Sequence, residues 1–238
     1  LPSLELAGFH IYSGTQCLKP ESIAENYEIF MAIFRELCAA HGIRPRKLVF
    51  GSGFGIPYHE KDRSLDAAEV AAHALPALRA FKAEPTFRDC ELLLETGRYL
   101  IGEAGIYLTR VVNRKSSRGT EIATFDGGMN HHLGAAGHLG MALHRNYRLF
   151  KVRGQDEAQD EPSRAFDLYG PLCTTIDVLG RGVMLPELLV GDVIGIHCSG
   201  AYGPTASPVH FISHDLPVEV IVEGETLREV SPRKRHGE

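Results

Sequence analysis

A glycine-rich turn is the first segment whose residue types suggest chemistry. The sequence GSGFG, residues 51–55, directly follows the apolar run KLVF. Backbone N–H groups in such a turn can surround an anion, because glycine has no side chain to obstruct it. The spacing differs from the GxGxxG of a dinucleotide loop, and the Lys-Ser/Thr pair of a P-loop is absent. By itself the turn indicates either an anion site or an ordinary tight turn.

Polar side chains also follow the apolar runs on either side of this one in the chain. Glu95 and Arg98 come just after the later run, and His10 and Ser13 lie at the end of the earlier run. In barrels of alternating strands and helices, active sites lie at the carboxyl ends of the strands. The three strand ends therefore offer groups suited to an anionic, aromatic ligand. A surface ion pair between Glu95 and Arg98, and a purely structural role for His10, are the alternatives.

The elements that must position these residues follow from hydrophobic periodicity. Up to about residue 104, short apolar runs alternate with amphipathic segments, which is typical of βα units and a parallel sheet. Apolar residues recur at helical spacing over residues 20–41, and Gly42 can end that helix. Ser64 can cap a second helix. The expected strands are Gly8–Tyr12, Lys47–Phe50 and Cys90–Leu94.

Beyond residue 105 the pattern changes to β-branched, partly alternating segments separated by Gly, Pro and Asn. These segments are IYLTRVVNRK, TEIATFDGG, DVIGIHC and PVEVIVEG, and VRGQDEAQDEPSRA (152–165) is expected to be a solvated loop. The pattern favours an antiparallel β domain. The predicted fold is α/β plus β: residues 1–104 form the later β/α units of an eight-fold barrel, and residues 105–238 form a β-sandwich or Greek-key domain. A closed barrel needs about 250 residues, so the missing units must come from preceding sequence or from a partner.

Composition narrows the class of protein. The 238 residues carry a net charge of −5, and the one basic cluster, Arg233 to Arg235, is expected to be a solvated tail, which argues against nucleic-acid binding. No run of about 18 apolar residues suggests a membrane span. The five cysteines form no CxxC pair, so a disulfide framework and a thiolate zinc site are not expected. The expected location of the protein is the reducing cytoplasm. Metal binding by His131, His132, His138 and His144 is possible in principle, but polar loop histidines are the favoured interpretation.

The motifs taken together resemble a known family. GFHIYSGTQ, FGSGFGIPY, ETGRYLIGEAG, FDGGMNHH, GPLCTTID and SGAYGPTASP occur in the order and approximate spacing found in fold-type III pyridoxal-phosphate amino-acid decarboxylases, the diaminopimelate and ornithine decarboxylase group. The likeness covers the chain up to about residue 223. Within the family, VVNRKSSRG, DGGMNHH and TASPVHFISH are most similar to the exosortase-associated decarboxylases and to the butirosin-type enzyme that acts on a glutamyl group held by an acyl carrier protein.

The resemblance implies pyridoxal 5'-phosphate as cofactor and a role for each strand-end residue. His10 matches the histidine that stacks on the cofactor ring. Glu95 matches the carboxylate that faces the pyridine nitrogen and keeps it protonated. The phosphate cradle, which needs donors and a fixed positive charge, matches Ser13, the turn of Gly51, Ser52, Gly53, Phe54 and Gly55, and then Arg98 and Tyr202.

The same resemblance implies a homodimer with shared sites. Cys173 in GPLC matches the residue that enters the neighbouring subunit's site and helps to direct protonation after carbon dioxide leaves. The other four cysteines are expected to be small buried apolar residues. Thr174 stands where many relatives carry an acid that binds a substrate amine, and the GGMNHH segment lacks the arginine that holds a distal carboxylate. The substrate's distal end is therefore expected to be uncharged or attached to a carrier protein.

The cofactor's lysine is expected to lie outside this chain. None of the seven lysines sits in the family's lysine motif, which belongs to an earlier barrel strand. The chain alone is therefore expected to be inactive. The leading interpretation is the C-terminal portion of a pyridoxal-phosphate-dependent decarboxylase, with diaminopimelate decarboxylase as the alternative enzyme. A non-catalytic regulatory homologue is the alternative from another class; retention of Glu95, Arg98, Cys173 and Tyr202 argues against it. A racemase is less favoured because of GPLC.

Overall fold

The computed structural model describes residues 3–139, 145–154 and 162–231. The chain divides into two compact units. The first comprises Leu1–Pro57 and Lys61–Leu100, and the second comprises Tyr58–Glu60 and Ile101–Glu238.

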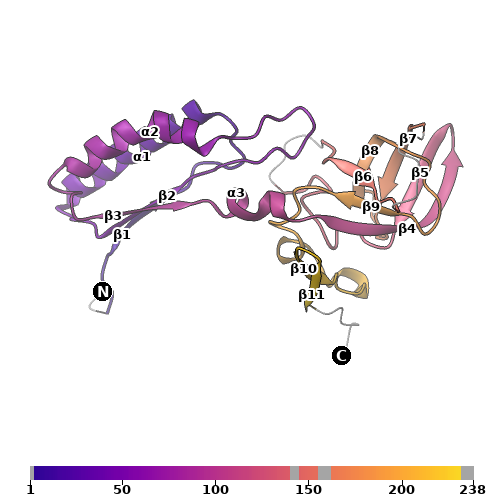
Figure 1. Ribbon diagram of the computed structural model, residues 1–238. Helices are drawn as coiled ribbons and strands as arrows, with labels where there is room; N and C mark the ends of the chain where they lie inside the picture. Colours follow the sequence, from indigo (N-terminus) through magenta and orange to yellow (C-terminus); the bar gives the residue numbers. More distant parts are fainter. Residues whose placement is uncertain (1–2, 140–144, 155–161, 232–238) are drawn as a thin grey trace. The chain divides into compact units, whose positions relative to one another are not determined.

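The first unit has a layer of strands and a layer of helices, and both helices cover the same face of the sheet (Figure 1). The sheet is parallel, in the order β1-β2-β3, which confirms the expected α/β pattern. Its elements in chain order are β1 (Gly8–Ile11), α1 (Pro20–His41), β2 (Lys47–Gly51), α2 (Ala67–Ala83) and β3 (Glu91–Glu95). A short helix α3 (Gly97–Ile101) and a 3-10 turn, Gly102–Ala104, follow β3.

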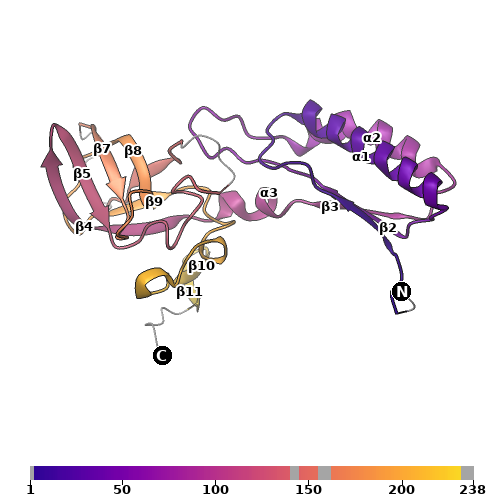
Figure 2. The ribbon, with the colours of Figure 1, turned by 180° about the vertical axis from the view of Figure 1, so that it is seen from behind.

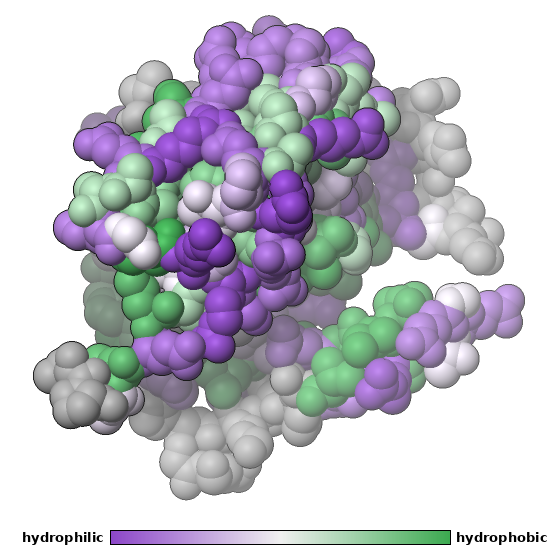
Figure 3. Space-filling view, turned by 90° about the vertical axis from the view of Figure 1, so that its left-hand side faces the viewer, coloured by the Kyte–Doolittle hydropathy of each residue, from purple (hydrophilic) through white to green (hydrophobic). Residues whose placement is uncertain are grey.

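Aromatic packing between the sheet and α1 fixes which face of the sheet stays open. Phe30 and Phe34 of α1 and Phe50 of β2 are fully buried. The ring centroid of Phe50 lies 6.1 Å from that of Phe30 and 5.4 Å from that of Phe34. Burying each such side chain contributes roughly 1.5–3 kcal/mol. Since neighbouring residues of a strand point to opposite faces, Val49 and His10 lie on the face away from the helices. The outer surface of the helical layer, at the top of Figure 3, is mainly hydrophilic.

The helix boundaries follow local chemistry, with one correction. Helix α1 begins at a proline and ends at Gly42, whose φ of 63° is the left-handed conformation expected of a C-terminal glycine. Helix α2, however, is capped by Asp66 and not by Ser64: the Asp66 carboxylate accepts a hydrogen bond from the Ala68 N–H at 2.8 Å. Ser64 lies two residues before this cap position, and it is too early in the chain to reach the Ala68 N–H, because a cap satisfies donors two or three positions ahead.

The second unit contains a six-stranded sheet in the order β6-β9-β4-β5-β7-β8. Figure 2 shows these strands from behind. The strands are β4 (Tyr107–Ser117), β5 (Thr120–Phe125), β6 (Leu149–Lys151), β7 (Arg164–Tyr169), β8 (Val178–Leu185) and β9 (Val193–Ile196). The expectation of a purely antiparallel domain was wrong in one place, because β5 and β7 pair in parallel. The connection between them is long enough for the chain to return to the same end of the sheet before β7 begins.

The two edge strands of this sheet are bridged by a side chain. Asn146, just before β6, accepts a hydrogen bond from the Arg181 N–H at 3.0 Å and donates one to the Arg181 carbonyl at 2.7 Å. Since Arg181 belongs to β8, the amide of Asn146 acts as a substitute for strand pairing between β6 and β8. Unpaired strand edges can pair with other chains, and these two hydrogen bonds cover one position of the β8 edge.

Two 3-10 turns, Pro204–Ala206 and Phe211–Ser213, lead to a separate hairpin of β10 (Glu219–Glu223) and β11 (Thr226–Ser231).

The limits of the solvated loop expected at residues 152–165 need a correction. Residues 155–161 lie outside the described residues, but Arg164 and Ala165, which were expected in the loop, belong to β7. The basic tail at 233–235 and His144 also lie outside them. No helix in the described part of the chain is long and apolar enough to cross a membrane.

The cysteines match their expected burial with one exception. Cys38, Cys90 and Cys198 are buried, and burial raises the pKa of each thiol. Cys17 packs against the core of the first unit but is only partly buried, so the expected apolar role is confirmed there and the expected burial was wrong. Its thiol lies 3.5 Å from the Lys19 carbonyl, in the loop that precedes α1.

Candidate functional site

The carboxyl ends of the three parallel strands meet at one edge of the sheet in the first unit. His10 pairs in register with Val49 of β2, and Gly51 pairs with Glu95 of β3. Parallel pairing therefore brings the ends of all three strands, with their predicted site residues, to the same edge.

His10 and Glu95 are in direct contact across the central strand. His10 Nε2 lies 3.0 Å from Glu95 Oε2, although the two residues are 85 positions apart in the sequence. About half of each side chain is exposed, on the face of the sheet that the helices leave open. The arrangement places a planar imidazole beside a carboxylate, which is a pair of groups able to contact the face and the ring nitrogen of a pyridine.

The glycine-rich turn packs backbone to backbone against the loop after β1. Cys17 N–H donates to the Gly53 carbonyl, and Gly55 N–H donates to the Cys17 carbonyl, both at 2.9 Å. A Cβ atom on Gly53 would lie 2.8 Å from the Gly14 carbonyl oxygen, and the φ of Gly53 is +67°. A Cβ on Gly55 would lie 2.8 Å from the Gln16 carbonyl carbon. The glycines thus join two loops, and the Gly55 N–H is already committed to that contact.

Other side chains brace this pair of loops. The buried Ser52 hydroxyl donates to the Glu95 carbonyl, which ties the end of β2 to the end of β3. Gln16, in the left-handed conformation at φ 57°, bonds both the N–H and the carbonyl of Ile56 through its amide. Sequence reasoning missed Gln16, whose only signal is its place in the GTQ motif. Phe54 is buried and packs edge-on against Tyr99, with centroids 5.4 Å apart.

Arg98 joins the same loop cluster from α3. Its Nη2 lies 3.5 Å from the Thr15 hydroxyl oxygen, so the guanidinium reaches the segment that contains Ser13. Ser13 itself is exposed. The structure therefore brings together Arg98, the Ser13–Thr15 segment and the glycine turn, which are the residues predicted to form a phosphate cradle. Thr15 was not among the predicted residues.

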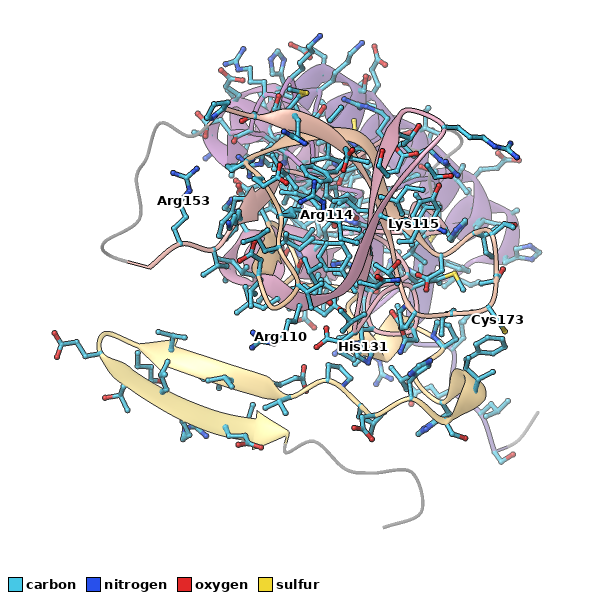
Figure 4. The ribbon with its side chains drawn as sticks, turned by 90° about the vertical axis from the view of Figure 1, so that its right-hand side faces the viewer. Arg110, Arg114, Lys115, His131, Arg153 and Cys173 are labelled. Atoms are coloured by element: carbon cyan, nitrogen blue, oxygen red, sulfur yellow. The ribbon has the colours of Figure 1, made fainter. Side chains whose placement is uncertain are left out.

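The other three predicted site residues belong to the second unit. Cys173 is exposed, and Figure 4 shows its sulfur directed outward at the edge of the unit. Thr174 follows it in the same loop and is partly buried. Tyr202 is 43% exposed and has a φ of 56°, a conformation that is strained for a bulky residue and often occurs at functional sites.

The histidine pair of the DGGMNHH motif is buried and fully engaged in the second unit. His131 Nε2–H donates to the Asp215 carbonyl at 2.8 Å, and its Nδ1 accepts from the Tyr107 hydroxyl at 3.1 Å. His132 Nδ1 accepts from the Ala135 N–H at 3.1 Å, and Nε2–H donates to the Ser199 hydroxyl at 3.0 Å. Both histidines lie in a loop, as expected, but they are internal. Among the described residues, no cluster of His, Cys, Asp and Glu could hold a metal ion.

Comparison with protein families identifies the class of this chain. Residues 9–200 match the family described as pyridoxal-dependent decarboxylase, C-terminal sheet domain. The chain belongs to this family, and the resemblance expected from the sequence motifs is confirmed. The cofactor of the family is pyridoxal phosphate.

Curated relatives and solved structures narrow the likeness. The chain is 33% identical over 214 residues to the L-glutamyl-BtrI acyl-carrier protein decarboxylase of Niallia circulans, and the matched segment covers 90% of this chain and 50% of the relative. It is 32% identical over 218 residues to the diaminopimelate decarboxylase of Methanothermobacter thermautotrophicus, covering 92% and 49%. The diaminopimelate decarboxylase of Helicobacter pylori, solved with L-lysine, gives a TM-score of 0.76 at 27% identity, covering 94% of this chain and 51% of that one. The chain thus spans about half the length of these relatives.

Proposed function

We propose that the whole protein is a pyridoxal-phosphate-dependent decarboxylase that acts on an aminoacyl group attached to a carrier protein. Residues 1–104 would supply the later β/α units of its eight-fold barrel, and residues 105–238 its C-terminal β domain. The parallel arrangement of β1, β2 and β3, with helices on one face, supports the first part. The identity with a carrier-protein decarboxylase over 90% of the chain is the observation that carries the substrate class.

The residues at the strand ends fit the cofactor. Bound pyridoxal phosphate supplies an electron sink for the carbanion left by decarboxylation. Arg98 would bind the phosphate as a permanent cation, beside the exposed Ser13 and the glycine turn, and Tyr202 would add a hydroxyl donor. The Glu95 carboxylate would hold a proton on the ring nitrogen, and His10 would orient the ring by stacking. The close packing of Gly53 and Gly55 against the neighbouring loop supports this assignment, because side chains there would push the cradle apart.

The enzyme is proposed to be a homodimer in which Cys173 serves the neighbouring subunit's site. Its exposure, on a loop of the second unit, makes the thiol available to a partner surface. In that site Cys173 would donate the proton that replaces carbon dioxide.

The substrate proposal predicts a clear kinetic preference in the full-length enzyme. Thr174 has no negative charge to pair with a distal ammonium as a carboxylate would. The side chains of His131 and His132 are buried in internal hydrogen bonds, so they offer nothing to a distal carboxylate. An unpaired charge in a closed site costs several kcal/mol. We expect kcat/KM for a glutamyl thioester on a carrier protein to exceed that for free diaminopimelate, ornithine or glutamate by about tenfold or more, or about 1.4 kcal/mol.

Diaminopimelate decarboxylase is the second candidate, since 32% identity to such an enzyme covers nearly as much of the chain. The same measurement separates the two. A tenfold preference for free diaminopimelate would overturn the carrier proposal. The distal carboxylate of diaminopimelate would then be bound by residues other than Thr174, His131 and His132. The unloaded carrier protein serves as the control for non-specific inhibition.

Cofactor binding provides a second prediction. Arg98→Ala in the full-length protein is expected to weaken pyridoxal-phosphate binding by about 1.5–3 kcal/mol, roughly 10- to 150-fold, because a hydrogen bond to a charged group is lost. Titration of the apoenzyme, followed by the cofactor's absorbance, measures the change. Arg88→Ala is the matched control, since Arg88 is exposed in the same unit but precedes β3, away from the carboxyl ends of the three strands. Equal affinities of the two variants would remove Arg98 from the phosphate site.

A further inference from the structure

Asp177 is a buried carboxylate that joins two loops of the second unit. Only 1% of the residue is exposed. Its Oδ1 accepts a hydrogen bond from the Met129 N–H at 2.6 Å, and its Oδ2 accepts one from the Leu172 N–H at 2.9 Å. Met129 belongs to the DGGMN motif, and Leu172 directly precedes Cys173. One side chain therefore ties the DGGMN loop to the loop that presents the thiol.

The backbone of Asp177 closes the Cys173 loop at its base. The Gly170 N–H donates to the Asp177 carbonyl at 3.1 Å, and the Asp177 N–H donates to the Thr174 carbonyl at 3.3 Å. The loop from Gly170 to Asp177 is thus held by both the backbone and the side chain of a single residue, while Cys173 remains exposed between these attachments.

Two glycines make room for this carboxylate. A Cβ atom on Gly128 would lie 2.4 Å from Asp177 Oδ1, and a Cβ on Gly170 would lie 2.2 Å from Oδ2. Real Cβ atoms do not approach oxygen so closely, so any larger residue at either position would displace the carboxylate. The carboxylate of Asp177 therefore lies in a socket, which is the space left between Gly128 and Gly170.

The apolar surroundings complete the socket. Met129, Ala136 and Leu172 pack together, with Leu133 against them. Burial raises the pKa of Asp177, while the two amide donors and the nearby His214 and His131 act in the opposite direction. A buried carboxylate needs such donors, and the loops supply them only when they lie side by side.

We propose that Asp177 is a positioning residue that fixes the backbone next to Cys173, so that the thiol is presented in one defined place to the reacting group. This inference rests on the proposed function, in which Cys173 donates a proton to the product. Asp177 itself lies beneath the loop and acts only through the backbone that it holds.

The test uses the full-length holoenzyme and Asp177→Asn, which keeps the shape but turns an amide NH2 toward one of the two N–H donors. Asp167→Asn is the matched control: Asp167 also accepts a backbone hydrogen bond, from the Gly182 N–H at 2.8 Å, but it lies in β7 outside the Cys173 loop. We expect Asp177→Asn to lower kcat by about tenfold with little change in KM, and to lower it by less than about threefold when Cys173 is already Ala. Hydrogen exchange of the segment containing Leu172 should accelerate in Asp177→Asn and not in the control.

The two backgrounds and the exchange measurement separate the possible outcomes. Equal losses of kcat with and without Cys173 would overturn the positioning role, because a general structural defect does not depend on the thiol. Unchanged exchange at Leu172, with Cys173→Ala itself impaired, would also overturn it while leaving the proposed function intact. An unimpaired Cys173→Ala enzyme would instead refute the role of the thiol, and the positioning role with it.

Discussion

Mixing two inactive full-length variants, Cys173→Ala and Glu95→Ala, in equal amounts is expected to restore about a quarter of the wild-type activity. In a homodimer with shared sites, random exchange places half of the subunits in hybrids, and one of the two sites of each hybrid carries both native residues. Glu95 lies at a strand end of the first unit, whereas Cys173 lies on an exposed loop of the second unit. Activity should rise from near zero to this level as the subunits exchange.

The control replaces the Glu95→Ala partner with a double variant that lacks both Glu95 and Cys173. Its hybrids contain no fully native site, so mixing it with Cys173→Ala should restore nothing. Subunit exchange is followed independently with two affinity tags of different mass. Complete exchange without recovered activity would mean that Cys173 serves its own chain's site or takes no part in the reaction.

The sequence predicted the elements whose cause is local. Helix α1 could be predicted because its apolar spacing and Gly42 lie within a single segment. The strand ends carrying His10, Gly51 and Glu95 were predictable because each strand is followed by its own polar or glycine-rich residues. Parallel pairing then had to bring those ends to one edge, which the register of β1, β2 and β3 confirms.

The features that sequence reasoning missed depend on partners far along the chain. Strand β7 pairs with β5 in parallel because of tertiary packing, and nothing in its six residues indicates direction. The contacts of Asp177 with Met129 span 48 positions, so the motif GPLCTTID showed the aspartate without showing what it binds. Likewise, the histidines of DGGMNHH look like solvated loop residues until Tyr107 and Ser199 are placed beside them.

His132 should make the second unit sensitive to acid in a defined interval. The residue is 2% exposed, and burial lowers its pKa from 6.5 to about 4. Its hydrogen bonds fit the neutral ring, because Nδ1 accepts from the Ala135 N–H while Nε2–H donates to Ser199. Protonation would add a hydrogen to Nδ1, which would then face the Ala135 N–H as a second donor and lose its hydrogen bond, in a site closed to water.

The sign of the effect follows from proton uptake. Between the two pKa values the unfolded chain binds a proton that the folded unit excludes, so stability falls as the pH falls. The contribution of neutral His132 is fully present above about pH 6.5 and is lost progressively down to about pH 4, and the total is roughly 3 kcal/mol. The raised pKa of Asp177 acts in the opposite direction in the most acidic part of this range.

Urea unfolding of the full-length protein, followed by circular dichroism between about pH 7 and about pH 4.5, measures this loss in the wild type and in His132→Gln. The glutamine keeps a donor for Ser199 but cannot take up a proton, so the variant should be less stable at neutral pH and should lose less stability on acidification. His138→Gln is the control: the residue is exposed in the same loop, and glutamine can replace its hydrogen bond to the Ile176 carbonyl, so the variant should keep the pH dependence of the wild type. If the free energy of unfolding falls with pH equally in the wild type and in His132→Gln, the buried ring accepts a proton without cost and the prediction is wrong.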